Sequence, residues 1–153
     1  MPRVEELFIQ VLCHATEDLK KVLRAVENVL GPEAADKISL STEVLEGHYG
    51  DPITLVRIFL LDREASEKAF SRILVNLTPL DREELWSERS KKGKHGGKLY
   101  LRLDKQAAFL GHIRPSDKDP IKIVVRIRGN VDVLRKRLEA KLTSEGDDIE
   151  VGR

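Results

Sequence analysis

The sequence has little cysteine and no long apolar run. Cys13 is the only cysteine among 153 residues, which excludes an internal disulfide and every zinc site built from several cysteines. A lone cysteine is typical of a reducing compartment, so we expect a cytoplasmic protein. No apolar stretch approaches the ~18 residues that a membrane-spanning helix needs. Residues 1–6 also lack the basic start of a signal peptide, so we expect no membrane partner.

Aromatic residues are scarce as well, and known nucleotide and RNA motifs are missing. Aromatics make up 5% of the chain, and no segment has the aromatic-rich pattern of RNA-recognition-motif strands or a GXXG loop in a KH-like setting. The glycine-rich segment 93–98 lacks the Ser or Thr that follows lysine in a phosphate-binding loop, and a strand rather than a helix is expected after it. Nucleotide hydrolysis is therefore disfavoured.

Charge is abundant but unevenly distributed. Residues 1–88 carry 10 Lys or Arg against 17 Asp or Glu, whereas residues 89–141 carry 16 against 5. The net charges are thus −7 and +11, although the whole chain is only at +1. Such asymmetry indicates an anionic partner for residues 89–141. The alternative is that the acidic and basic parts pair with each other, within the fold or across a dimer.

Hydrophobic periodicity and capping residues predict ten elements in the order β-α-β-β-α-α-β-α-β-α. Strands are expected at 4–14, 38–46, 53–61, 98–103 and 121–128. Helices are expected to follow Thr16, Asp62, Thr78, Asp104 and Asn130 as their N-caps. Because hairpins and helices are mixed, the fold class is α+β, with a largely antiparallel sheet packed with helices. We expect one domain over 1–143 and a polar, acidic tail over 144–153.

The first predicted strand is apolar on both faces, with Leu7 and Ile9 on one and Phe8 and Leu12 on the other. It is therefore expected to be covered on both sides or to lie at a subunit contact. Cys13 and His14 point to opposite faces of this strand and cannot share a proton.

No metal or catalytic site follows from the spacing of other residues. His14 with Glu17 or Asp18 would suit a metal, but helix capping explains these acids better. We therefore expect no metal and no cofactor.

A basic face is the clearest functional signal. Two amphipathic strands, 98–103 and 121–128, share outward faces without an acid; these carry Lys98, Tyr100, Arg102, Lys122, Arg126 and Arg128. The neighbouring segment adds Arg89, Lys91, Lys92 and Lys94. Lysine and arginine neutralise phosphates, and an exposed aromatic ring can stack on an unpaired base. The alternative is a solvated face, or edge strands whose charge blocks aggregation.

Three segments resemble a known family: HATED at 14–18, EGHYGDPI at 46–53 and LYLRLDKQAAFLG at 99–111. Together they are similar to the archaeal RNA-binding proteins sometimes labelled a predicted exosome subunit. The similarity spans roughly residues 4–128. It implies RNA binding without catalysis, a homodimer, and a fold similar to the RNA-binding domain of the fifth large-subunit ribosomal protein. The family implies no specific RNA-contact residues for this chain.

We therefore expect a non-catalytic RNA-binding protein that contacts the RNA backbone through the basic strands and loop. A second hypothesis is a protein-interaction adaptor that docks an acidic partner, with an RNA-processing protein as that partner. A third is an enzyme acting on RNA, with His48 or His14 as general acid or base.

Overall fold

A computed structural model describes residues 1–47, 49–87 and 96–151, with side chains up to residue 143. Its strands are β1 (Arg3–Cys13), β2 (Ile38–Glu46), β3 (Pro52–Leu60), β4 (Gly96–Leu103) and β5 (Ile121–Arg128). Its helices are α1 (Leu19–Leu30), α2 (Arg63–Asn76), α3 (Pro79–Ser87), α4 (Lys105–Phe109) and α5 (Val131–Val151). The predicted order of elements and the α+β class are confirmed.

The five strands form one sheet in the order β2-β3-β1-β5-β4, and all neighbouring strands are antiparallel. The central strand β1 pairs with β3 on one side, for example Leu7 with Leu60, and with β5 on the other, for example Leu7 with Val125. The largely antiparallel sheet is thus confirmed.

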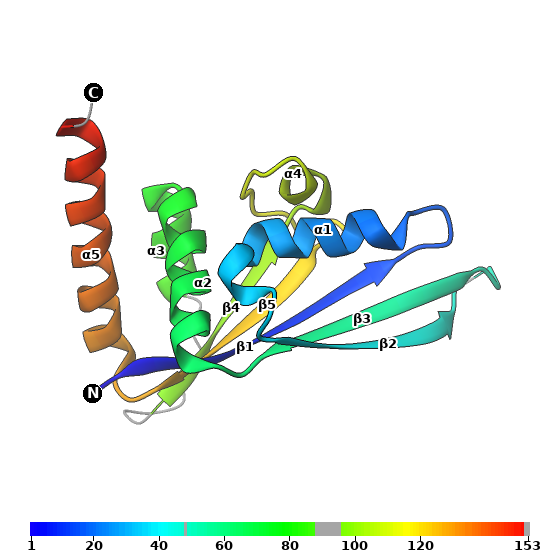
Figure 1. Ribbon diagram of the computed structural model, residues 1–153, viewed down its shortest axis with the longest axis horizontal. Helices are drawn as coiled ribbons and strands as arrows, with labels where there is room; N and C mark the ends of the chain where they lie inside the picture. The colour runs from blue at the N-terminus through cyan, green and yellow to red at the C-terminus, as the bar shows by residue number, and fades with distance from the viewer. Residues whose placement is uncertain (48, 88–95, 152–153) are drawn as a thin grey trace.

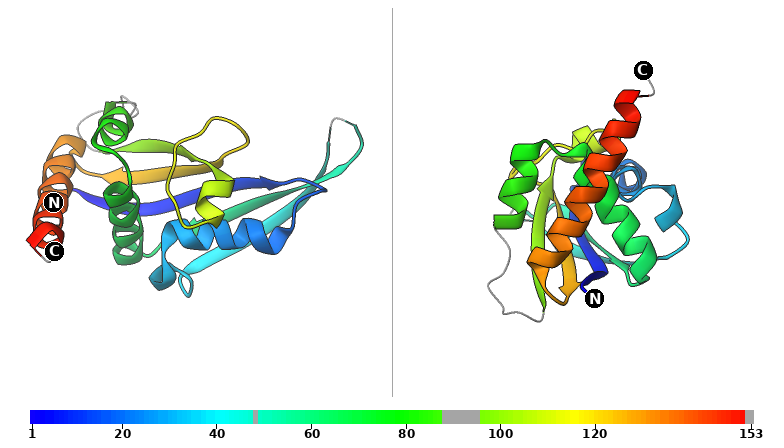
Figure 2. Two further views of the ribbon diagram at one scale, coloured as in Figure 1. Left: turned by 90° about the horizontal axis from the view of Figure 1, so that it is seen from above. Right: turned by 90° about the vertical axis from the view of Figure 1, so that its left-hand side faces the viewer.

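The helices cover only one face of the sheet. Figures 1 and 2 show them on the upper side, with no described helix on the lower side. The covered face supplies a core in which Leu7, Ile9, Ile58 and Ile123 are at most 1% exposed. Burial of these apolar side chains stabilises the fold by roughly 1.5–3 kcal/mol each. The opposite face, which we call the open face, carries the other half of each strand's side chains.

Helix starts mostly follow the predicted caps. The carboxylate of Asp62 accepts a hydrogen bond from the Ala65 N–H, and that of Asp104 from the Ala107 N–H. The prediction for α1 is wrong, because its N-cap is Asp18, which accepts from the Lys20 N–H, and not Thr16.

The buried side of α1 and the length of α5 also differ from the prediction. The helical spacing of apolar residues predicts a buried side of α1 made of Leu19, Val22, Leu23, Val26 and Leu30. Leu19 is instead 36% exposed, and Ala25 and Val29 are buried as well. At the other end of the chain, α5 continues to Val151 and so enters the segment expected to be a tail. The domain boundary at residue 143 stays a prediction. No described helix is long and apolar enough to cross a membrane.

Candidate functional site

The six basic and aromatic residues predicted on the last two strands lie together on the open face. The pairing of β4 with β5 sets Lys98 beside Arg126 and Arg102 beside Lys122, and Tyr100 lies between these pairs, opposite Val124. All six side chains, including Arg128 at the end of β5, are exposed. The structure thus brings these residues into one continuous surface. Arg89, Lys91, Lys92 and Lys94 lie outside the described residues.

Two further strands extend this surface with residues that the periodicity of the basic strands does not reveal. Phe8 of β1 pairs with Phe59 of β3, and its other neighbour is Val124 of β5. The two phenyl rings lie 5.0 Å apart between centroids, at an interplanar angle of 42°. Two residues further along β1, on the same face, Gln10 lies between Arg57 of β3 and Lys122 of β5. The apolar second face of residues 4–14 was the signal for this extension.

Acidic residues of the first half of the chain neutralise part of the basic surface. Arg126 pairs with Glu6 at 2.9 Å, and Arg57 pairs with Glu43 at 3.0 Å. The Glu5 carboxylate accepts a hydrogen bond from the Arg3 guanidinium group at 3.0 Å, and the guanidinium group of Arg128 lies 3.9 Å from the same carboxylate.

The hydrogen bond from Arg3, which outweighs the opposing effect of burial, holds the pKa of Glu5 below its usual range. The pairs Arg126–Glu6 and Arg128–Glu5 join the two charge blocks, as the alternative interpretation requires.

Arg102 and Lys122 are not members of these pairs. Within the described part of the chain, the side chains of Arg102 and Lys122 form no ion pair or hydrogen bond, and both are exposed. Arg102 and Tyr100 also border a groove of about 230 Å³ beside α3, where Asp81, Glu84 and Asp117 add acidic groups at the β4 edge.

A second polar cluster lies on the helical side, around the buried ammonium group of Lys105. Its Nζ lies 2.8 Å from the Leu12 carbonyl oxygen, 2.9 Å from the Glu17 carboxylate and 2.7 Å from that of Asp119. The His14 Nε2 lies 2.9 Å from the same Asp119 carboxylate. Asp119 has φ of 44°, a left-handed conformation that aspartate tolerates better than most residues.

This cluster fits a structural ion-pair network better than a metal site. One atom each from His14, Glu17 and Asp119 lie within 4.8 Å of one another, which is close enough to share an ion. The Lys105 ammonium group, however, already supplies positive charge to both carboxylates. A divalent ion at the same place would be repelled by it. The cluster joins two of the segments that carry the family resemblance, 14–18 and 99–111.

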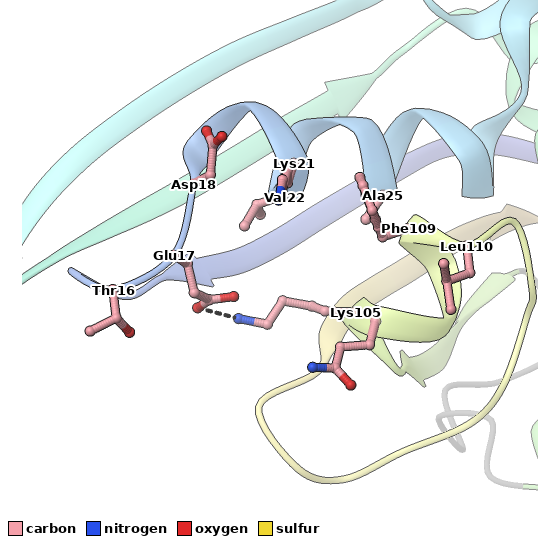
Figure 3. A pocket seen from close by; sticks show the side chains of 10 residues that line it. Thr16, Glu17, Asp18, Lys21, Val22, Ala25, Lys105, Phe109 and Leu110 are labelled. Carbon is pink, nitrogen blue, oxygen red and sulfur yellow. Dashed lines mark hydrogen bonds and ion pairs between the residues drawn. The ribbon is translucent and has the colours of Figure 1, made fainter.

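A groove of about 480 Å³ runs between α1 and α4 next to this cluster. Figure 3 shows Glu17 and Lys105 pointing toward one another at one end of it, while Phe109 reaches toward α1. The Lys21 ammonium group lies 5.9 Å from the centre of the Phe109 ring. Glu17 and Lys105 pair with each other at this end of the groove, and the exposed Asp18 also borders it.

Known proteins resemble this chain in sequence and in fold. RNA-binding protein PAB1135 from Pyrococcus abyssi is 32% identical over 139 residues, which cover 90% of this chain and 89% of that protein. The uncharacterized protein MJ0213 from Methanocaldococcus jannaschii is 35% identical over 119 residues, or 74% and 76% of the two chains. The solved structure of Mth689, a DUF54 protein from Methanothermobacter thermautotrophicus, superposes with a TM-score of 0.72 at 28% identity. That match covers 89% of this chain and 98% of the other.

A family model described as RNA binding matches residues 6–128. The matched range begins in β1 and ends with the last residue of β5, so it contains the whole sheet except the start of β1. It also contains all the described residues of the open face named above, apart from Arg3 and Glu5. On the extent of this match, the chain belongs to the protein family described as RNA binding.

Proposed function

We propose that this protein is a non-catalytic RNA-binding protein that contacts the RNA backbone through the basic residues of its open face. The observation that carries the proposal is the register of β4 and β5, which places six exposed basic or aromatic residues on one surface. Their cationic groups can neutralise phosphates and release counterions. The family description and the name of the Pyrococcus relative support RNA as the anion.

Arg102 and Lys122 are the two residues on which we expect the affinity to depend most. They lie side by side across β4 and β5 and have no acidic partner in the described structure. A cation without an intramolecular partner loses no ion pair when it contacts phosphate. Arg126 and Arg57, in contrast, must break their ion pairs with Glu6 and Glu43 before they can contact a phosphate.

The experiment measures RNA affinity over a salt series for the wild type and for Arg102→Gln/Lys122→Gln. We expect an affinity loss of about tenfold, since two exposed charge contacts contribute on the order of 1.4 kcal/mol together. On single-stranded RNA the slope of log affinity against log salt should become shallower by about 1.4, or ~0.7 per phosphate.

Lys20→Gln/Arg24→Gln is the matched control, because it removes the same charge from the exposed side of α1. Its affinity should remain close to that of the wild type. Equal losses in the two double variants would contradict the assignment of the open face. Absence of RNA binding by the wild type at low salt would contradict the function itself and favour an acidic protein partner.

The absence of catalysis belongs to the same proposal. His14 is held by Asp119 beside a buried lysine on the helical side, and we assign it to that network and not to a reaction. RNA incubated with the protein should stay intact, and His14→Ala should leave RNA affinity unchanged. His48 lies outside the described residues. The exosome association, the homodimer and the likeness to a ribosomal protein stay predictions from the resemblance.

A further inference from the structure

A row of apolar side chains crosses the open face from strand to strand. It runs from Phe59 on β3 through Phe8 on β1 and Val124 on β5 to Tyr100 on β4, each beside the next in the strand register. Phe59 is 36% exposed and Tyr100 is 42% exposed, and Phe8 and Val124 are half-buried. We call these four residues the aromatic row.

Sheet stability alone does not account for the aromatic row. Cross-strand pairs of an aromatic residue with an aromatic or β-branched one, such as Phe8 with Phe59, stabilise a sheet. Such pairing explains the order of the side chains across the strands, Tyr100 beside Val124 included, but not why Phe59 is 36% exposed and Tyr100 42% exposed. Exposed apolar side chains that are contiguous and rimmed by polar residues are typical of a binding surface.

Cations border the aromatic row on both sides. Two residues along the strands in one direction lie Arg57, Lys122 and Arg102, together with Gln10; in the other direction lie Arg126 and Lys98, together with Glu6, which pairs with Arg126. Residues two apart on a strand are separated by roughly 6.6 Å, so these groups are adjacent to the rings. Flat apolar rings flanked by positive charge complement a ligand that combines flat bases with phosphates.

We propose that the ligand of the open face is single-stranded RNA whose unpaired bases stack on the aromatic row while its phosphates contact the flanking cations. This inference rests on the proposed function and adds the class of RNA. In a duplex the base faces are stacked on each other, and proteins recognise its shape and 2′-hydroxyls. The aromatic rings therefore could not stack on the bases of a duplex. Phe59 and Tyr100 are three strand spacings apart, roughly 14 Å, which gives two separate stacking positions.

The test compares three ligands at constant salt with the wild-type protein: a single-stranded oligoribonucleotide, an oligomer of the same length without bases, and a duplex of the same sequence. We expect the base-containing single strand to bind most tightly. Each stacked base should raise the affinity by roughly fivefold to a hundredfold over the abasic oligomer. This arm requires no variant and is independent of any effect of mutation on folding.

Variants then locate the stacking positions. Tyr100→Leu and Phe59→Leu keep apolar bulk but lose the ring, so they should weaken binding of the base-containing strand and leave the abasic oligomer unaffected. Tyr100→Phe keeps the ring and should bind as the wild type does. The salt slope should remain unchanged in all three, in contrast to Arg102→Gln/Lys122→Gln.

The outcomes separate the two proposals. Equal affinity for the abasic and base-containing strands, or tighter binding of the duplex, would overturn stacking and leave RNA binding by the cations intact. No binding of any of the three ligands would overturn both. If the ring variants instead convert a dimer into monomers and keep full RNA affinity, the aromatic row is a contact with a second copy of the chain and the inference is wrong.

Discussion

Lys105 connects three separate parts of the chain through one ammonium group. It lies at the start of α4 and bonds the end of β1, the start of the α1 region and the loop that leads into β5. Its side chain is only 10% exposed. A charge buried to this degree contributes little when paired but costs much when its partner is removed.

We therefore expect Lys105→Met to lower the free energy of unfolding by about 3 kcal/mol. The variant leaves the Glu17 and Asp119 carboxylates close together without a cation between them. Urea denaturation measures the loss. Lys21→Met is the control, since among the described residues the ammonium group of this exposed lysine makes only the cation–π contact with Phe109, worth about 0.5–1 kcal/mol. A loss no larger in Lys105→Met than in the control would contradict the structural role.

The sequence predicts the residues of the basic strands better than those of the aromatic row. Strict alternation along 98–103 and 121–128 determines which side chains face outward, whatever the strands pair with. The position of Phe8 beside Phe59 depends instead on the strand order β3-β1-β5, which periodicity does not contain. The Lys105 cluster is hidden for the same reason, because Lys105 and Glu17 lie 88 residues apart in the chain.

At the scale of elements, Asp62 illustrates how one carboxylate starts a helix. Its side chain accepts the Ala65 N–H at the start of α2, and this hydrogen bond, with a smaller contribution from Lys37, lowers the pKa of Asp62 below its usual value. A carboxyl whose pKa is lower in the folded state stabilises the fold above its unfolded pKa, about 3.9. That stabilisation is lost as the pH falls through the folded pKa.

Asp62→Asn should remove this pH-dependent part of the stability, because asparagine can cap the helix but does not ionise. We expect wild type to unfold at higher urea than the variant at pH 6, and the two midpoints to converge as the pH falls from about 3.9, the unfolded pKa, through the lower folded pKa. Urea midpoints over a pH series give the measurement. A constant difference between the two proteins down to pH 2.5 would show that the charge of Asp62 is not responsible.

Helix starts show where sequence reasoning succeeds and where it does not. Asp62, Asp104 and Asn130 are the capping residues expected from the sequence, because each directly precedes an apolar helical pattern. Three polar candidates, Thr16, Glu17 and Asp18, precede α1 in succession. Glu17 pairs with Lys105 and α1 begins after Asp18, so the order of these polar residues does not by itself identify the N-cap.

At the scale of the whole molecule, the sheet depends on pairing between distant parts of the chain. β1 pairs with β5 from Arg3 opposite Arg128 to Gln10 opposite Lys122, so the partners are more than 110 residues apart. Sheets with such non-local pairing fold more slowly than helical bundles. Contacts between residues close in sequence, such as those within helices, cannot form this core without the pairing of β1 with β5.

We expect refolding after dilution from urea to take milliseconds to seconds. Trp86, the only tryptophan, is 1% exposed, contacts Phe70 of α2 and donates to Glu139 of α5 at 3.0 Å. Its fluorescence therefore reports when these helices have packed together. Stopped-flow fluorescence provides the rate, and recovery of the native signal within microseconds would contradict the dependence on distant strands.

The central position of β1 also affects the protein while it is being synthesised. The strands β2, β3 and β1 are complete once residue 60 has been made, but β1 gains its second neighbour only after residue 128. At 5–20 residues per second, the ribosome needs on the order of 3–14 s for the intervening segment. During that interval β1, which is apolar on both faces, has an unpaired edge. The nascent chain is then most vulnerable to strand pairing with its neighbours on the same messenger RNA.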